Sequence, residues 1–444
     1  MPFIANTDAQ CQAMLEAIGA DSIEALFADI PSALRSGALD LPRGLSEQEV
    51  RDRLAELADY NRTDLISFLG GGVYDHFIPA AVPALVSRSE FYTAYTPYQP
   101  EASQGNLQAI FEFQSAICRL TEMEVANASL YDGGTALYEA MMMALRITRR
   151  NKVIVDDSVS PIYRTMIRSY TRNLGIELLE TPHNRGLPGR DAIKDDLDEK
   201  TAAVIVQNPT FFGCIDDASD LAELAHEKGA LLVVSVYPIS LGLLKTPGAM
   251  GADIVTGEGQ SLGLPLSFGG PYLGFMASRA RYVRKMPGRI AGRARDSRGR
   301  EGFVLTLQAR EQHIRREKAT SNICTNEALC ALTALVYLSL LGKQGLRDVA
   351  RVCADKAWYA QEQLVKLPGV TLKYGSRWYF NEFVLTLPMP ADKVIRRLIQ
   401  RGLAAGFPLV RYWPEMDRDL LIAVTEKRTK KEIDLLVHLL ETIL

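Results

Sequence analysis

The chain has 444 residues, of which 47% are hydrophobic and 23% are charged, and its formal net charge at pH 7 is −3. A chain of this length exceeds what one simple hydrophobic core accommodates, so we expect two closely packed domains. The nearly balanced charge excludes a general attraction to nucleic acid, and no apolar run approaches the roughly 20 residues that span a bilayer.

The N-terminus and the cysteines favour a cytoplasmic protein. The opening residues, MPFIANTDAQ, lack a charged region followed by an apolar stretch, which argues against a secretory signal. The 6 cysteines are scattered without a CxxC pair, so we predict no disulfide framework and no zinc site. The 5 histidines lack metal-ligand spacing, and we therefore predict no metal.

Residues 1–60 have the pattern of a separate helical segment. Amphipathic helices are expected at residues 11–18, 22–28 and 46–60. Ser46 and Glu49 form the sequence signature of a capping box at the start of the third helix. This segment is too short to be a catalytic domain alone.

Residues 61–325 are predicted to form a large α/β domain. Short apolar or β-branched runs alternate there with helical stretches, which indicates a mostly parallel sheet covered on both faces. Helices are expected at residues 135–149, 161–174, 218–228 and 239–250. The seven expected strands are residues 126–130, 152–156, 176–180, 203–207, 231–236, 253–256 and 272–277.

Residues 326–444 are predicted to form a connecting helix and a small α+β domain. The helix covers about residues 326–367. Strands are expected after it at residues 383–387 and 420–424, with helices at 391–401 and 430–444.

Two loops are candidates for chemistry. Gly133, Gly134 and Thr135 follow the first strand and open a helix, an arrangement that presents free N–H groups to an anion. Simple helix capping by Asp132 or Thr135 would give the same pattern. Residues 95–101 carry two tyrosines and two prolines, which is typical of an ordered functional loop, although a packing loop remains an equal alternative.

The segment of residues 279–318 departs from the overall charge balance. It holds thirteen Lys or Arg residues against four Asp or Glu residues. One interpretation is a surface for an acidic partner or an anionic group. A solvated face with internal ion pairs is the other.

Several sequence blocks resemble one family. Seven strands, a Gly-Gly-Thr turn, an Asn-Pro turn at Asn208 and a small C-terminal domain resemble fold-type I enzymes, which use pyridoxal 5'-phosphate (PLP). Nearly the whole chain is similar to the glycine cleavage system P-protein, glycine dehydrogenase (decarboxylating), and most similar to its subunit 1, the N-terminal-half subunit of the two-subunit form. The blocks are residues 69–74 with 78–79, 95–105, 131–136, 286–292 and 310–325.

The resemblance also shows what this chain lacks. A fold-type I enzyme needs a lysine that forms a Schiff base with PLP and an aspartate beside the pyridine nitrogen. Counting from Ala252 and Asp253 places Gln260 at the family's histidine and Ser261 at its lysine, while Ser235 takes the aspartate position. Serine can supply neither an imine nor a negative charge. The nearest lysines, Lys245 and Lys285, do not fall at strand ends.

We therefore expect PLP to be bound by a partner, P-protein subunit 2, in a heterotetramer. The resemblance implies decarboxylation of glycine and transfer of its aminomethyl group to the lipoamide of the H-protein. The hypothesis is that loops of this chain complete the partner's site. The basic surroundings of His313 favour a positional over an acid–base role. The candidate residues are Tyr95, Tyr98, Arg310, His313, Lys318 and Asn322.

Two other functions remain open at this point. An independent PLP enzyme would use another lysine, and it would show bound PLP on the isolated chain. A non-catalytic regulatory or scaffolding paralogue would add no activity when it is mixed with a partner.

Overall fold

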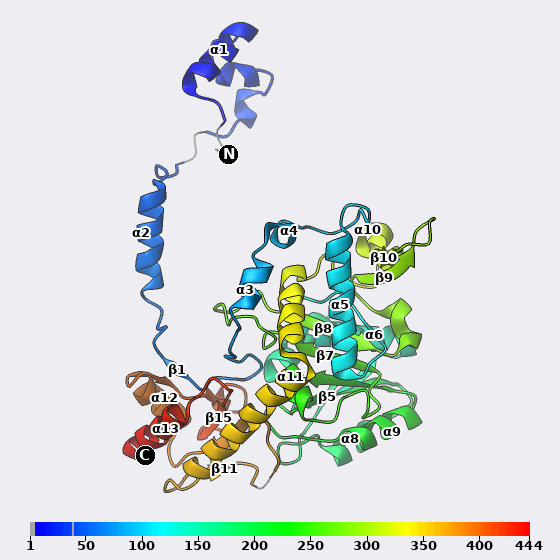
Figure 1. The fold of residues 1–444 in the computed structure, drawn as a ribbon, viewed down its shortest axis with the longest axis vertical. Helices are drawn as coiled ribbons and strands as arrows, with labels where there is room; N and C mark the ends of the chain where they lie inside the picture. The colour runs from blue at the N-terminus through cyan, green and yellow to red at the C-terminus, as the bar shows by residue number, and fades with distance from the viewer. Residues whose placement is uncertain (1–4, 38–39, 376) are drawn as a thin grey trace. The chain divides into compact units, whose positions relative to one another are not determined.

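The computed structural model describes residues 5–37, 40–375 and 377–444. The chain forms two compact units, Met1–Thr63 and Asp64–Leu444 (Figure 1). The domain boundaries predicted at residues 60 and 325 stay predictions.

The first unit is helical. Its elements are α1 (Asp8–Ile18), η1 (Glu24–Phe27), η2 (Ser32–Leu34) and α2 (Glu47–Ala58). The predicted capping box is confirmed, because Ser46 N donates to Glu49 Oε2 over 2.7 Å and Glu49 N donates to Ser46 Oγ over 3.3 Å. None of the described residues of this unit is buried.

The second unit is built on a seven-stranded sheet, which confirms the predicted α/β class. Five strands run parallel in the order β7, β6, β5, β3 and β4, and β8 joins β7 and β2 antiparallel. Six of the seven predicted strands are present with small shifts at their ends. The first, predicted at residues 126–130, is only the two-residue β2, and Leu130 adds an isolated bridge to Gly274. The strands of the sheet are β2 (Val125–Ala126), β3 (Lys152–Asp156), β4 (Glu177–Thr181), β5 (Thr201–Asn208), β6 (Leu231–Val236), β7 (Ile254–Glu258) and β8 (Gly274–Ser278).

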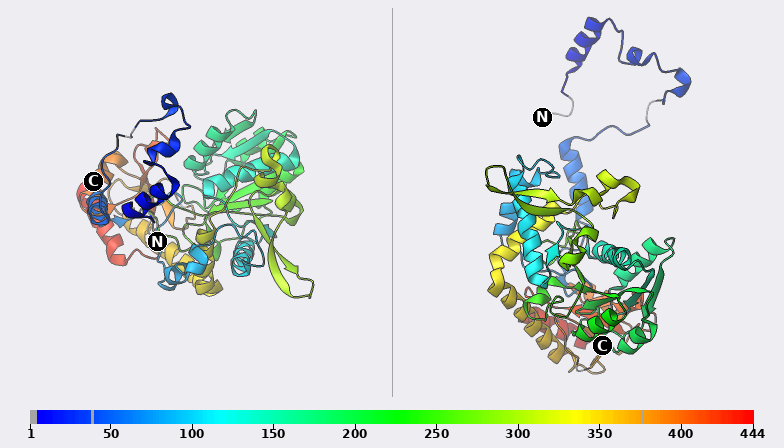
Figure 2. Two further views of the ribbon diagram at one scale, coloured as in Figure 1. Left: turned by 90° about the horizontal axis from the view of Figure 1, so that it is seen from above. Right: turned by 90° about the vertical axis from the view of Figure 1, so that its right-hand side faces the viewer.

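Helices cover both faces of this sheet because alternate strand residues point to opposite sides. Val204 and Val206 face a core with α5 (Gln104–Thr121), α8 (Arg190–Asp196) and α9 (Ser219–Glu227). Ala203 and Ile205 face a second core with α6 (Gly133–Thr148) and α7 (Pro161–Thr171). The left view of Figure 2 shows α6 and α7 on the side of the sheet opposite to α5.

One predicted helix is wrong. Residues 239–250 form only the short η3 (Pro238–Gly242) and a loop. Pro247 cannot donate a helical hydrogen bond. Gly242 packs so closely on α11 (Ala328–Leu364) that a Cβ there would lie 2.8 Å from Leu346 O.

Helix α11 connects the large sheet to a smaller one. Gly342 has non-helical angles (φ 59°, ψ −173°) inside it, which breaks the helix in two. Within the described residues, α11 is long and apolar enough to cross a membrane by length and composition. Ala331, Ala334 and Tyr337 are nevertheless buried in the core against the large sheet.

The smaller sheet has the order β11, β12, β15 and β14. It packs with two helices and the end of α11 around its own core. The elements are β11 (Thr371–Leu372), β12 (Glu382–Thr386), α12 (Ala391–Ile399), β14 (Phe407–Pro408), η7 (Leu409–Arg411), β15 (Asp419–Ala423) and α13 (Lys430–Ile443). A two-residue pair joins β1 (Ile66–Ser67) to β13 (Leu403–Ala404).

The remaining elements carry the loops of interest. Helices α3 (Ala81–Val86) and α4 (Ser89–Tyr92) lead into the tyrosine loop. The basic segment forms η4 (Ala280–Lys285), the hairpin of β9 (Ile290–Arg295) and β10 (Glu301–Thr306), η5 (Gln308–Arg310), α10 (Gln312–Arg315) and η6 (Arg316–Lys318). The β9–β10 hairpin extends away from the sheet (Figure 2, left).

Candidate functional site

The cleft lies at the carboxyl ends of β5, β6 and β7, where an open parallel sheet places its ligands. The small sheet closes it from the other side. Its free volume is about 20 Å³, which is room for about one water molecule. The lining residues are Gly72, Tyr74, Ser160, Tyr163, Gln207, Phe211, Ser235, Val236, Tyr237, Glu258 and Glu382.

A carboxylate of the chain occupies the anion position at the start of α6. Gly133 N donates to Glu258 Oε2 over 2.9 Å. Gln260 N and Leu273 N donate to the other oxygen of Glu258, over 2.9 and 3.0 Å. A Cβ on Gly133 would lie 2.9 Å from the Glu258 Cβ, so only glycine permits this approach. Burial raises the pKa of the Glu258 carboxyl to about 7.

The same turn is also capped within the helix. Asp132 Oδ1 accepts a hydrogen bond from Thr135 N over 2.8 Å. The sequence left capping and anion binding open at Gly133, Gly134 and Thr135. The structure shows capping by Asp132, and the anion that it shows at Gly133 is the Glu258 side chain.

A tyrosine and a second glutamate fill the middle of the cleft. Tyr74 Oη donates to Glu382 Oε2 over 2.6 Å, and Gly71 N donates to Glu382 Oε1 over 2.7 Å. Burial raises the pKa of Glu382 to about 7. Gln260 fixes the loop that carries Tyr74, because its Oε1 accepts from Tyr74 N over 2.8 Å and its Nε2 donates to Tyr74 O over 3.1 Å.

The residues at the two PLP-anchoring positions are buried serines. Ser235 lies in β6, and Ser261 follows β7 with no hydrogen-bond partner for its Oγ. Among the described residues that line the cleft there is no lysine. Lys245 is instead paired with Asp217 over 2.9 Å, and Lys285 is exposed at the end of η4. The residues of this cleft therefore do not fit PLP.

The structure joins some of the other candidate residues and separates the rest. The rings of Tyr98 and His313 lie 5.6 Å apart, with Arg310 near the start of the same turn. Tyr95 is 80% exposed and lines a separate small pocket beside α5 and α11. Lys318 in η6 and Asn322 are exposed, and neither forms a hydrogen bond or ion pair with Tyr98 or His313.

Sequence reasoning missed two charged residues beside this pair. Arg289 is 3% exposed, and its Nη2 donates to Tyr98 Oη over 3.0 Å. Glu311 is 7% exposed and lies 3.6 Å from His313 Nδ1. The block of residues 286–292 carried Arg289 as part of the family resemblance, but no local signal showed that its side chain is buried.

The sequence also gave no sign of a compact polar cluster below the cleft. His76, Cys353 and Glu426 place one potential metal-ligand atom each within 4.8 Å of one another. These atoms already share hydrogen bonds: His76 Nδ1 pairs with Glu426 Oε2 over 2.6 Å, and Cys353 Sγ donates to the same oxygen over 3.4 Å. The cluster fastens the loop that carries Tyr74 to α11 and to the segment after β15.

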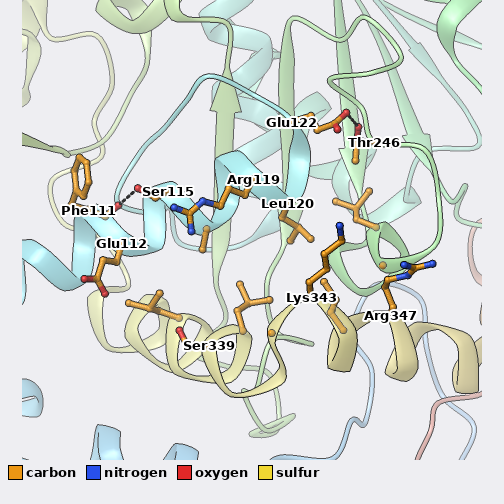
Figure 3. Close-up of a pocket in the computed structure, with 17 residues that line it drawn as sticks. Phe111, Glu112, Ser115, Arg119, Leu120, Glu122, Thr246, Ser339, Lys343 and Arg347 are labelled. Carbon is orange, nitrogen blue, oxygen red and sulfur yellow. Dashed lines mark hydrogen bonds between the residues drawn. The ribbon is translucent and has the colours of Figure 1, made fainter.

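A much larger pocket lies away from the cleft, between α5, η3 and α11 (Figure 3). Its volume is about 860 Å³, and it opens at the break in α11. Arg119, Lys343 and Arg347 line it and are all exposed. No group in this pocket defines a ligand, so it does not enter the site.

Comparison with solved structures first assigns the fold of the chain. The structure is similar to a sphingosine-1-phosphate lyase of Burkholderia pseudomallei, with a TM-score of 0.68 at 14% identity over 93% of this chain and 94% of that one. It is also similar to a NifS-like protein of Rickettsia africae, with a TM-score of 0.64 at 12% identity over 85% of this chain and 99% of that one. Together with the strand order, these likenesses define the fold of the type I PLP-dependent enzymes.

The family follows from closer relatives. The model of the glycine cleavage system P-protein family matches residues 1–440. A crystal structure of glycine decarboxylase (P-protein) in inhibitor-bound form matches with a TM-score of 0.92, at 45% identity and full coverage of both chains. A probable glycine dehydrogenase (decarboxylating) subunit 1 of Nitratidesulfovibrio vulgaris is 57% identical over the whole of both chains. The homologous subunit 1 of Geotalea uraniireducens is 57% identical over 99% of each.

The chain belongs to the glycine cleavage system P-protein family, as its sequence blocks indicated. The name "subunit 1" of its relatives implies a second subunit, and the family is PLP-dependent.

Proposed function

We propose that this chain is the subunit of a glycine-decarboxylating enzyme that holds no PLP itself and completes the active site of its partner. The filled cleft carries this proposal. Glu258 occupies the anion position, Tyr74 and Glu382 occupy the centre, and Ser261 replaces the lysine. PLP then resides on subunit 2, where it serves as the electron acceptor when glycine loses CO2.

The exposed loops supply the part that this chain contributes. Fold-type I enzymes build their sites where two subunits meet. Tyr98, with 46% of its surface exposed, and the exposed His313 present aromatic rings at the surface, while the buried side chains of Arg289 and Glu311 lie beside them inside the chain. Tyr95, Arg310, Lys318 and Asn322 belong to the same two loops and are proposed to line the interface.

The carrier protein is the second proposed partner. In the family's reaction the aminomethyl group passes to the lipoamide of the H-protein, which we expect to be acidic. The β9–β10 hairpin carries exposed Arg295 and Arg298, while Arg300 is paired with Asp296 over 2.8 Å. The ion pair of Arg300 fits the interpretation of internal pairing, and the unpaired Arg295 and Arg298 support electrostatic steering of an acidic partner.

The proposal is tested in the complex reconstituted with subunit 2. Tyr98→Phe is expected to lower kcat for CO2 release from glycine about tenfold, because a displaced contact at a reacting group is costly. Tyr170→Phe on α7 is the matched control, since Tyr170 is also exposed but lies against Tyr138. Unchanged kcat in Tyr98→Phe and in Tyr95→Phe would contradict the catalytic contribution of this loop.

A further inference from the structure

A buried pair of opposite charges lies directly beneath Tyr98 and His313. The side chains of Arg289 and Glu311 are 3% and 6% exposed, and Arg289 Nε lies 4.0 Å from Glu311 Oε2. Charged side chains of this kind are rarely buried without a partner or a task. Arg289 Nε and Glu311 Oε1 nevertheless have no hydrogen-bond partner. The pair is therefore not accounted for by stability alone.

Each member of the pair contacts one of the two exposed rings. Arg289 Nη2 donates to Tyr98 Oη over 3.0 Å, and the guanidinium carbon lies 5.5 Å from the Tyr98 ring centre. Glu311 Oε2 lies 3.6 Å from His313 Nδ1. The two rings meet edge to face, with an angle of 64° between their planes. The four side chains thus form one cluster, in which a buried charged group contacts each of the two exposed rings.

The backbone of Arg289 is fixed to the large sheet. Ala128 N donates to Arg289 O over 2.8 Å, and Asn127 Nδ2 donates to Pro287 O over 3.1 Å. Gly288 has a φ of 75°, and a Cβ there would lie 3.1 Å from Asn127 Nδ2. This anchoring makes Arg289 a rigid support, whereas Tyr98 sits on an irregular loop without one.

We propose that Arg289 and Glu311 hold the Tyr98 hydroxyl and the His313 ring in one orientation, so that Arg289 is a positioning residue for the reaction at the subunit interface. This inference rests on the proposed function of Tyr98. It adds that the activity depends on a residue that touches neither glycine nor the carrier.

A double-mutant cycle in the reconstituted complex tests the inference. Arg289→Gln and Tyr98→Phe are each expected to lower kcat about tenfold, with a smaller change in the KM for glycine. Because both variants break the same hydrogen bond, the double variant should be no slower than Tyr98→Phe alone. Arg351→Gln, at an exposed arginine on α11 outside the basic segment, is the matched control and should match the wild type.

The outcomes separate this inference from the proposed function. If Tyr98→Phe lowers kcat while Arg289→Gln does not, or if the two effects multiply, the positioning role is overturned and the role of Tyr98 stands. If Tyr98→Phe itself has no effect, the proposed function of the loop fails as well.

A second variant covers the case in which Arg289→Gln does not fold. Arg289→Lys keeps the buried positive charge but loses the planar fork that reaches Tyr98 and Glu311 together. It should unfold at the same temperature as the wild type and still lower kcat. Full activity in a folded Arg289→Lys complex would overturn the inference.

Discussion

The backbone N–H of Gly133 donates a hydrogen bond to the carboxylate of Glu258 over 2.9 Å, across 125 residues of sequence. The N-terminus of a long helix attracts an anion, and here the chain supplies that anion from its own strand β7. The N–H group of Gly133 at the start of α6, the kind of position where a fold of this type binds an anion, thus has its hydrogen-bond acceptor within the protein.

Removal of this carboxylate should destabilise the chain and open an anion site. Glu258→Ala leaves three buried N–H groups without an acceptor, which should lower the free energy of unfolding by about 2–3 kcal/mol in urea. Inorganic phosphate should then raise the melting temperature of the variant more than that of the wild type. Glu301→Ala, on the exposed hairpin, is the control. An unchanged urea midpoint for Glu258→Ala would contradict the assignment.

The second buried glutamate makes stability depend on pH. Burial raises the pKa of Glu382 from its ordinary value of 4.5 to about 7. The folded state holds this proton more tightly than the unfolded chain does. Protonation of Glu382 therefore stabilises the fold fully below pH 4.5, and this contribution is lost as the pH rises through 7.

Glu382→Gln remains neutral at every pH, and its amide can still bond Gly71 N and Tyr74 Oη. The unfolding free energy of the variant minus that of the wild type should therefore rise by about 3 kcal/mol from about pH 4 to about pH 8. Denaturant unfolding at a series of pH values measures this difference. A difference that stays constant with pH would show that the pKa of Glu382 is the same in the folded and unfolded states, and would contradict the raised pKa.

The polar cluster at His76 should contribute to stability. His76 is 5% exposed and pairs with both Glu426 and Tyr237. His76→Ala leaves these buried groups without a partner, so the unfolding free energy should fall by about 2–3 kcal/mol. His438→Ala, an exposed histidine on α13, should change it by less than about 0.5 kcal/mol. Equal effects of the two variants in thermal unfolding would rule out this role for His76.

The basic hairpin should govern the encounter with the carrier. Arg295→Glu with Arg298→Glu should lower kcat/KM for the H-protein about tenfold at low salt, and should flatten its dependence on ionic strength. Lys194→Glu with Lys366→Glu makes the same change of charge at exposed positions outside the basic segment. If both pairs of substitutions act alike, the net charge rather than the hairpin controls the rate.

Local sequence patterns predicted most of the strands and the helix caps. The family resemblance assigned Ser235 and Ser261 to the PLP-anchoring positions, and of the two Ser235 lines the cleft. Contacts between distant segments could not be predicted. Tyr74 and Glu382 are 308 residues apart, and Gly133 and Glu258 are 125 apart, so no local pattern records their hydrogen bonds. The burial of Arg289 and Glu311 was not predicted either, because the neighbouring arginines in the sequence are exposed and no local pattern distinguishes Arg289 from them.

The helix predicted at residues 239–250 failed for a related reason. The close approach of Gly242 to the backbone of α11 is set by packing, which overrides local helical propensity. Tyr95 was grouped with Tyr98 on composition, but the loop turns the two side chains toward different parts of the surface.

The central claim is that this chain completes a PLP site without holding PLP. The direct measurement is borohydride reduction of the complex with subunit 2 in the presence of PLP, followed by mass spectrometry of both chains, with CO2 release from glycine measured for each chain alone and for the mixture. We expect a reduced PLP–lysine adduct only on subunit 2, and full activity only in the mixture. A stoichiometric adduct on a lysine of this chain, or undiminished activity of subunit 2 alone, would contradict this claim.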